Sequence, residues 1–395
     1  MSIQIISIIV GLLSVIGVDA GKGPANFEDH IIVPLSPNQV HRGITGSILK
    51  LKENSLLFAY SFSAEEPLSK RYPGGGIAAR KSKDLGRTWS EASILQPRVG
   101  AGETIHPSLL RLPDGKILLA YDVQNLTTDD TNVGGDQHMY VRVSSDEGKT
   151  WSEQMSATHM PGICHTMPGK MVLLSTGRII LPVESSWPVD GNHFVSLCFY
   201  SDNNGSIWWP SKNHVEFDPD DKKHPEASEP SVVELADGRL IMICRTQRGY
   251  LARSYSQDMG LNWSKPELIT DLHCSPSGFH VVRLPTTGDL LAIYCNNPHT
   301  VEWLEGTNKT KVDVAQLKNY PLGRVRAPLS TAISRDGGKT WHHHRNITND
   351  PKGVYGDYGY PCVTFLDQGK ILLINYHAID GIHLARIGVN WFYGK

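Results

Sequence analysis

The sequence has almost no excess of charge of either sign. Its 395 residues include 38 lysines and arginines and 40 aspartates and glutamates, a formal net charge of -2, and no basic tract stands out. A protein that holds nucleic acid through its phosphates usually carries a basic face. The balanced charge therefore argues against nucleic acid as a partner. A chain of this length can hold one large domain or two or three ordinary ones.

Beyond its first twenty residues the chain also lacks an apolar run long enough to cross a bilayer as a helix. The one long run, Ile5 to Val18, is short for a membrane span, and Val18-Asp19-Ala20 has the small-residue spacing of a signal-peptidase site. We therefore predict a secretory signal peptide over residues 1–20 and no integral membrane segment after its cleavage. The expected location is secreted or extracytoplasmic.

Cysteine pairs with the spacing of metal ligands are missing as well. The six cysteines form no CxxC motif, and several of them sit within apolar runs. Buried free thiols and one or two disulfides are both compatible with this pattern, whereas a zinc site is not favoured. We expect no metal and no cofactor. We also expect His165, His280 and the triplet 342–344 to be structural, because they lack ligand spacing.

What the chain does contain is a repeated turn that ends in a tryptophan. Serine, aspartate or asparagine, and glycine recur at fixed offsets before that tryptophan. Such side chains satisfy backbone donors in a turn, and glycine adopts the conformation that other residues avoid. The five copies are SKDLGRTW (82–89), SSDEGKTW (144–151), SDNNGSIW (201–208), SQDMGLNW (256–263) and SRDGGKTW (334–341).

A second repeat, a β-hairpin with a glycine-containing turn, lies between these segments. Each copy follows one β-rich run and precedes another, as in SLLRLPDGKILLAYD. In the first five units a third strand then enters the tryptophan turn, and a fourth segment follows it. The hairpin turns are LKEN at 51, LPDG at 112, LSTG at 174, LADG at 235, LPTTG at 284 and LDQG at 366.

Six four-stranded units in succession predict an all-β fold, a six-bladed β-propeller with antiparallel blades. The sixth unit ends with the chain, and the early segment FEDHIIVPL (27–35) could supply its missing outer strand. Nothing resembles an interdomain linker, so we predict a single propeller domain over residues 21–395. The longest irregular stretch, 299–323, is expected to be a loop inserted in the fifth unit.

The repeated turn resembles the Asp box of the sialidase, or neuraminidase, superfamily, and the six hairpin units are similar to its six-bladed propeller. The resemblance covers essentially the whole mature chain. Members of that family hold the sugar carboxylate with three arginines and use a tyrosine nucleophile assisted by a glutamate, with an aspartate as acid/base. The resemblance therefore implies a retaining, exo-acting glycoside hydrolase that acts on acidic glycans or glycoconjugates.

Local motifs that resemble those of the family assign its three arginines and its glutamate to residues of this chain. SEPSVVELADGRLIMICR resembles the family's Glu-x-x-Val-Val-Glu-Leu run, and it offers Glu229 as the partner of the tyrosine and Arg245 as the second arginine. RAPLSTAISRDGGKTW offers Arg326 as the third arginine, with Arg324 as a near rival. HRGITGSILKL resembles the family's opening Arg-Ile-Pro segment and offers Arg42 as the first arginine.

The segment GYPCVTFLDQGKILL offers Tyr360 as the nucleophile, and this position has counterparts in two other units. His106, Glu229 and Tyr360 each precede a proline. Each lies eight residues before the same position of the following hairpin turn, which is 114, 237 and 368 respectively. Proline is tolerated at the start of a strand, so the preceding side chain is presented at the edge of the blade. We therefore predict that the three positions are equivalent. In an antiparallel meander Arg42, Glu229, Arg245, Arg326 and Tyr360 all fall on the face opposite the Asp boxes.

Two positions depart from the family pattern. The chain has His106-Pro107 where an Asp-Pro with the acid/base aspartate is expected, and it has Gly74-Gly75-Gly76 where a second aspartate usually precedes the first Asp box. A histidine titrates near neutral pH and can act as an acid/base. Glu103 or Asp136 could also reach the site.

Three functions stay open at this point. The first is a retaining sialidase-type hydrolase in which Tyr360 is the nucleophile, Glu229 assists it and His106 replaces the aspartate. The second is a propeller polysaccharide lyase, in which the arginines neutralise a uronate carboxylate and a His/Tyr pair removes the C5 proton and protonates the leaving oxygen. The third is a non-catalytic glycan-binding propeller that keeps the arginines.

Overall fold

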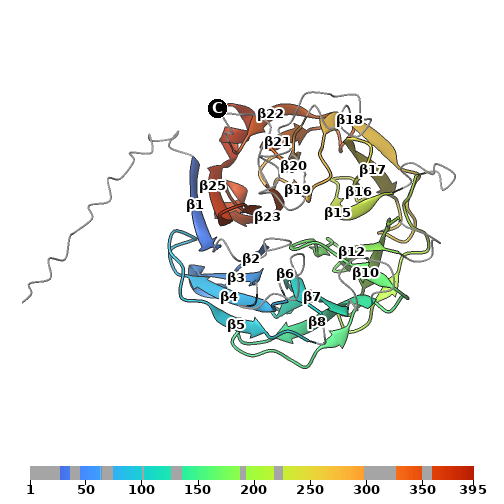
Figure 1. Cartoon of the computed structure of the whole chain (residues 1–395). Helices are drawn as coiled ribbons and strands as arrows, with labels where there is room; N and C mark the ends of the chain where they lie inside the picture. The colour runs from blue at the N-terminus through green and yellow to red at the C-terminus, as the bar shows by residue number, and fades with distance from the viewer. Residues whose placement is uncertain are drawn as a thin grey trace, which may run out of the picture.

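The computed structural model describes residues 27–35, 45–62, 64, 74–99, 102–125, 136–186, 193–217, 226–297, 326–348 and 358–395. The predicted signal peptide, Arg42, Arg324 and the predicted loop 299–323 lie outside these ranges. The described chain is all-β, as predicted, and its sheets follow one another around a ring (Figure 1). Nowhere in the described ranges is there a helix with the length and apolarity needed to cross a membrane.

Three blades are separate four-stranded antiparallel sheets built from consecutive strands. The first contains β2 (Gly46–Lys50), β3 (Leu56–Ser61), β4 (Ile77–Ser82) and β5 (Ser93–Gln96). The fourth contains β15 (Ser228–Glu234), β16 (Leu240–Arg245), β17 (Tyr250–Ser256) and β18 (Glu267–His273). The fifth contains β19 (His280–Arg283), β20 (Leu290–Cys295), β21 (Leu329–Ser334) and β22 (His342–Asn346).

The second and third blades are joined into one nine-stranded sheet. The short strand β10 (Ile163–His165) joins them, because it pairs parallel with the second blade and antiparallel with the third. It thereby carries His165 into the boundary between the two blades. The second blade contains β6 (Thr104–Arg111), β7 (Ile117–Asn125), β8 (Asp136–Ser144) and β9 (Met155–Ser156). The third contains β11 (Val172–Leu173), β12 (Ile179–Ser185), β13 (Val195–Ser201) and β14 (Trp209–Pro210).

The sixth blade closes the ring with strands from both ends of the chain. β23 (Gly359–Leu366), β24 (Ile371–Ala378) and β25 (Gly381–Gly388) come from the C-terminal part, and β1 (Phe27–Pro34) pairs antiparallel with β25. Figure 1 shows the blue β1 beside the red β25. The prediction that the early segment supplies the outer strand is confirmed, and its ladder of hydrogen bonds opposes opening of the ring.

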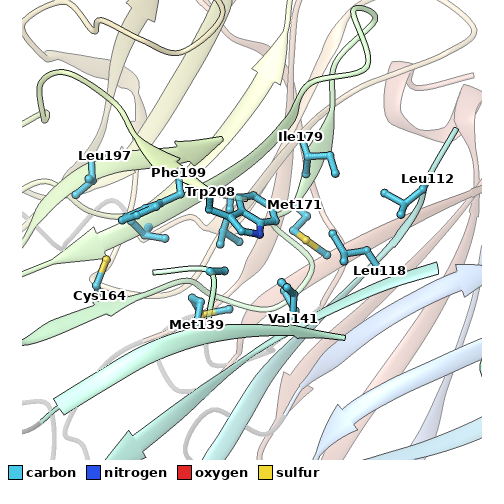
Figure 2. Packing of buried hydrophobic residues seen from close by; sticks show 14 of the residues in the cluster. Leu112, Leu118, Met139, Val141, Cys164, Met171, Ile179, Leu197, Phe199 and Trp208 are labelled. Carbon is cyan, nitrogen blue, oxygen red and sulfur yellow. The ribbon is translucent and has the colours of Figure 1, made fainter. Parts of the chain in front are cut away.

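The hydrophobic core lies between neighbouring blades. The inner strands are almost continuously apolar, because each blade is covered on both faces. Met139 of the second blade, Phe199 of the third and Trp208, which ends the third Asp box, are buried in one cluster (Figure 2). The repeated tryptophan therefore packs between strands, and replacing such a residue with alanine typically costs about 3–5 kcal/mol.

Each Asp box is held by its own side chains, as the sequence predicts. In the first box, Ser82 Oγ accepts a hydrogen bond from the Gly86 N–H and Asp84 Oδ1 accepts one from the Thr88 N–H, both at 2.8 Å. Gly86 has a φ of 95°, in the left-handed region that favours glycine, and Trp89 Nε1 donates to its carbonyl oxygen at 3.1 Å. The contacts with Thr88 are the main cause that lowers the pKa of Asp84 to about 2.

Six equivalent positions on the innermost segments fill the centre of the ring. Each lies four residues before the leucine of the hairpin turn, and all six side chains are buried. Serines link neighbouring blades: Ser47 Oγ accepts a hydrogen bond from the Leu109 N–H, and Ser108 Oγ accepts one from the Met171 N–H, both at 3.1 Å. The six positions are Ser47, Ser108, Lys170, Ser231, His280 and Cys362.

Lys170 reaches from the third blade to the fifth. Its ammonium donates to the Phe279 carbonyl oxygen, and Nζ lies 4.8 Å from the centre of the Phe279 ring. Burial lowers the pKa of Lys170 to about 7, although Cys362 and Glu229 oppose this shift. The centre of the propeller is therefore packed with polar side chains.

All six cysteines lie in the described residues and are buried thiols, so the disulfide alternative is wrong.

Candidate active site

His106, Glu229 and Tyr360 occupy the same place in three blades, as the proline spacing predicts. They have positive φ angles of 57°, 45° and 50°. In all three blades the pairing of the first and second strands shifts register at this point. A β-bulge redirects a side chain, and a positive φ strains any residue other than glycine. Three copies of one strained bulge therefore bring these side chains to the same end of the ring.

Glu229 and Arg245 form a buried ion pair in the fourth blade. Arg245 Nη1 donates to Glu229 Oε1, and the two residues are 8% and 5% exposed. Burial acts to lower the pKa of Arg245, but the nearby carboxylates, Glu229 first among them, outweigh it and hold that pKa above its ordinary value. Glu229 Oε2 and Arg245 Nε make no hydrogen bond within the described residues. Both atoms are buried and keep unused hydrogen-bonding capacity.

Tyr360 is held by residues of the first and fifth blades and by Arg326. The guanidinium carbon of Arg326, which is buried, lies 5.7 Å from the centre of the Tyr360 ring. Thr45 Oγ1 donates to the Tyr360 carbonyl oxygen at 3.0 Å. The ring rests against the main chain of Gly278, where a Cβ would lie 2.3 Å from Tyr360 Cδ1. Only glycine leaves room for the ring at that place.

Four of the five positions predicted to meet opposite the Asp boxes are described, and the structure brings them together. Glu229 contacts Arg245, Arg326 contacts Tyr360, and the charge of Arg245 interacts with Tyr360. The fifth, Arg42, lies outside the described residues. Among the described residues the Tyr360 hydroxyl makes no hydrogen bond with Glu229. The cluster offers two guanidinium groups, one carboxylate and one phenol.

His106 is held by Asp122, which the sequence analysis missed. His106 Nδ1 lies 3.1 Å from Asp122 Oδ2, and Gln137 Nε2 donates to the same oxygen at 2.5 Å. Asp122 is fully buried. Burial acts to raise its pKa, but His106 and His165 outweigh burial and lower that pKa to about 2. Asp122 therefore remains a carboxylate across the neutral range.

A signal for Asp122 was present in the sequence. Asp122 lies ten residues after the leucine of its hairpin turn, and Glu184 and Arg245 lie at the same distance in the next two blades. All three lie toward the end of the second strand of their blade, in β7, β12 and β16. All three are buried. Asp122 and Glu184 therefore share the spacing of Arg245, which the local motif had assigned.

His165 lies between the carboxylates of Asp122 and Glu184. The sequence predicted only a structural role for it and not this placement. Its Nε2 lies 2.8 Å from Glu184 Oε1, and its Nδ1 lies 3.1 Å from Asp122 Oδ2 without the alignment of a hydrogen bond. Burial acts to lower the pKa of His165, but the two carboxylates raise it to about 10. The His106 and His165 rings are stacked with their centres 5.6 Å apart.

His106, Asp122 and His165 offer three ligand atoms within 4.8 Å of one another, so this cluster could hold a metal ion. Imidazole and carboxylate ligands suit zinc. The sequence did not predict this three-residue cluster, because its members are far apart in the sequence. The His106 ring is nevertheless aligned on Asp122 as a hydrogen bond, and Gln137 donates to the same oxygen. Both contacts are to Asp122 Oδ2, and Asp122 Oδ1 makes no hydrogen bond within the described residues.

The other two acidic residues considered for acid/base work, Glu103 and Asp136, contact partners outside the cluster described above. Glu103 is buried, and its Oε1 accepts a hydrogen bond from the Gly74 N–H at 3.3 Å. Asp136 is exposed and lies 2.6 Å from His138 Nε2. A Cβ at Gly75 would lie 1.7 Å from the Phe62 carbonyl oxygen. The glycines that replace the second expected aspartate are therefore required by close backbone packing.

The fold and the site together define a class of protein, a six-bladed β-propeller with Asp-box turns and a cluster of arginine, glutamate and tyrosine at the opposite end. The family model for the BNR repeat-like domain matches residues 74–373. The chain therefore belongs to the BNR repeat-like family, and the predicted resemblance to sialidases is confirmed.

Two similar relatives are sialidases from clostridia. The sialidase of Paraclostridium sordellii is 28% identical over 329 residues, which cover 75% of this chain and 72% of that protein. The sialidase of Clostridium perfringens is 27% identical over 208 residues, which cover 47% of this chain and 52% of that protein. The match to the second relative therefore spans about half of its length.

Solved structures agree on the fold. A protein of unknown function from Dyadobacter fermentans DSM 18053 aligns with a TM-score of 0.68 at 20% identity, covering 92% of this chain and all of that one. The Hadza microbial sialidase Hz136 aligns with a TM-score of 0.63 at 16% identity, covering 89% of this chain and 66% of that one. At these identities the likeness shows the fold, and the activity has to be argued from the site.

Proposed function

We propose that the protein is a secreted or extracytoplasmic, exo-acting, retaining hydrolase of sialidase type, which releases terminal sialic acid or a related acidic sugar from glycoconjugates. The observation that carries this proposal is the placement of two buried guanidinium groups, Arg245 and Arg326, beside Tyr360 and Glu229. A planar guanidinium binds a carboxylate through two hydrogen bonds and orients it. Arg42 is proposed as the third arginine of this set.

In the proposed reaction the Tyr360 oxygen attacks the anomeric carbon while the bond to the leaving oxygen breaks. Glu229 accepts the phenol proton, and protonated His106 donates a proton from Nε2 to the leaving oxygen. A carboxylate on the anomeric carbon repels an anionic nucleophile, which favours a neutral phenol. Water then attacks the same carbon, His106 takes a proton from it, and Glu229 returns a proton to the departing Tyr360 oxygen.

A second candidate, a uronate lyase, is favoured by the hydrogen bond between His106 and Asp122. A carboxylate that orients a histidine supports its action as a base. His106 would then remove the C5 proton of a uronate, Tyr360 would protonate the leaving oxygen, and a double bond would form in the sugar. The arginines would neutralise the uronate carboxylate in the same place.

Release of a fluorophore from a 2-O-sialoside tests the first candidate directly. We expect turnover by the full chain and a loss of about 1,000-fold or more in Tyr360→Phe, because the nucleophile is removed. Proton NMR of the first product should show retained anomeric configuration. Tyr255→Phe is the matched control, because its hydroxyl bonds to the Gly337 carbonyl oxygen, away from the site.

Other outcomes distinguish the alternatives. Absorbance of an unsaturated uronate, without release from the sialoside, would establish the lyase. Binding of acidic glycans without turnover of either substrate would establish a binding propeller and contradict the proposed hydrolase.

A further inference from the structure

A chain of buried polar contacts runs from His106 in the second blade to Glu229 in the fourth. His106 Nδ1 lies 3.1 Å from Asp122 Oδ2, which in turn lies 3.1 Å from His165 Nδ1. His165 Nε2 lies 2.8 Å from Glu184 Oε1. The other oxygen of Glu184 accepts a hydrogen bond from the Glu229 backbone N–H at 2.9 Å. The two ends of this chain are the proposed acid/base and the proposed partner of the nucleophile.

The burial of these groups makes their pairing necessary. Asp122 is 0% exposed, and His165 and Glu184 are each 6% exposed. An unpaired charge in such a place is costly, and removal of one partner of a buried pair typically costs about 3–5 kcal/mol. Each member of the chain therefore restricts the position of the next.

The charge states of the chain follow from its contacts. Asp122 stays ionised, and the pKa of Glu184 is lowered because His165 outweighs the effect of burial. The pKa of His165 is about 10, since two carboxylates oppose the effect of burial, so at neutral pH this ring is a fixed cation between them. Beyond Glu184 the next charged group is Arg245, whose charge also lowers the pKa of Glu184. The carboxylate of Glu103 accepts a hydrogen bond from the Gly74 N–H.

An ionised Asp122 can only accept hydrogen bonds, so the His106 nitrogen that faces it must carry a hydrogen. The opposite nitrogen, Nε2, is then the one whose proton can be exchanged with a substrate. The positive φ of 57° at His106 and the hydrogen bond from its N–H to Ser61 Oγ fix the main chain that carries the ring. The ring is therefore constrained both in its position and in its tautomer.

We propose that Asp122, His165 and Glu184 are positioning residues: they keep the hydrogen of neutral His106 on Nδ1, leave Nε2 for the substrate and tie His106 to Glu229. Their effect on catalysis rests on the proposed function, whereas their effect on the His106 tautomer does not. Loss of Asp122 should therefore free the His106 ring to carry its hydrogen on either nitrogen.

Nitrogen-15 NMR of histidine-labelled protein tests the tautomer without any substrate. We expect neutral His106, assigned by the signal missing in His106→Gln, to carry its hydrogen on Nδ1 in the wild type and to lose that preference in Asp122→Asn. Asp146→Asn is the matched control, because Asp146 bonds within its own Asp box. A wild-type His106 with its hydrogen on Nε2 would overturn the proposal whatever the enzyme's activity.

Steady-state kinetics on the substrate that the wild type cleaves test the catalytic part. In Asp122→Asn we expect a loss of about 100-fold or more, mainly in kcat, with little change in KM. In His165→Gln we expect a smaller loss, again in kcat. A loss that appears mainly in KM, or an unchanged kcat in Asp122→Asn, would contradict the proposal.

A metal ion in the same cluster is the competing explanation. The NMR spectra and the assay are therefore repeated with EDTA and with added Zn²⁺. Unchanged His106 signals and unchanged activity support the positioning chain. Stoichiometric perturbation of the His106 and His165 ring nitrogens by Zn²⁺, together with loss of activity in EDTA, would replace it with a metal site.

Discussion

The two ends of the propeller are constructed in different ways. At one end, each Asp box is held by local contacts: the side chains of Ser82 and Asp84 bond with partners no more than four residues away. At the other end, the partners come from different strands and blades. His106 and Asp122 are 16 residues apart, and Glu184 and Glu229 are 45 apart. The repeated turn is therefore a local device for building blades, whereas the site exists only when the blades are assembled.

Among the substitutions that test this comparison, the largest effect is expected at Gly278, on the site end. A Cβ there would lie 2.3 Å from Tyr360 Cδ1, so Gly278→Ala should displace the ring of the proposed nucleophile. We expect kcat to fall by about 100-fold or more, because small misplacements of reacting groups are costly. Steady-state kinetics and thermal unfolding of the same sample measure the two effects separately.

Gly115→Ala is the control for that prediction. At Gly115 a Cβ would meet nothing within 4 Å, but its φ of 85° strains alanine. We expect a loss of about 1 kcal/mol in the free energy of unfolding and unchanged turnover. A Gly278→Ala protein that keeps most of its kcat would show that the packing of Tyr360 on Gly278 does not position the nucleophile.

The next effect concerns Lys170, at the centre between the two ends. Its pKa is about 7 in the folded protein and 10.5 ordinarily, so between these values the unfolded chain binds more protons and stability rises with pH. Lys170→Met removes the buried amine. We expect it to stabilise the fold by about 2 kcal/mol relative to the wild type at pH 6, with this advantage shrinking toward pH 10.

Urea unfolding at several pH values measures this difference. His280→Gln, at an equivalent position in the fifth blade, is the comparison variant for a lost polar group at the centre. An advantage of Lys170→Met that stays constant from pH 6 to pH 10 would show that the amine is protonated to the same extent in the folded and unfolded states.

The smallest effect is expected at the Asp-box end. Asp84→Ala removes hydrogen bonds to Thr88 and should cost about 1 kcal/mol of folding free energy, since the group is largely exposed to solvent. The lowered pKa of Asp84 means that its contribution is present above pH 3.8 and is lost as the pH falls through about 2. Turnover should equal that of the wild type and of Lys83→Ala, an exposed neighbour. A large loss of activity would mean that the boxes do more than build blades.

The repeats predicted much of the site as well as the fold. The hairpin spacing placed His106, Glu229 and Tyr360 at equivalent positions, and all three have the same bulge and positive φ. Asp122 and Glu184 follow a second spacing, because each lies ten residues after the leucine of its hairpin turn, as Arg245 does. These two residues could have been predicted by applying the spacing rule to every blade.

His165 could not have been found in this way. It lies between the second and third blades because β10 pairs with strands of both. The pairing of β10 depends on how the second and third blades pack against each other. The segment GICHTM contains no periodic pattern that predicts it. The same holds for Lys170, whose partner Phe279 is 109 residues away across the ring.

The sequence by itself determined the blades, their number, the turns and the strand that closes the ring, because alternation, turn chemistry and repeat length act over a few residues. The tertiary structure alone decided which of the site's side chains touch one another, and it added His165 to them. Closure of the ring brings the ends of inner strands from several blades into one buried volume. There, the cost of unpaired charge favours the contacts of Asp122 with His165, of His165 with Glu184 and of Arg245 with Glu229.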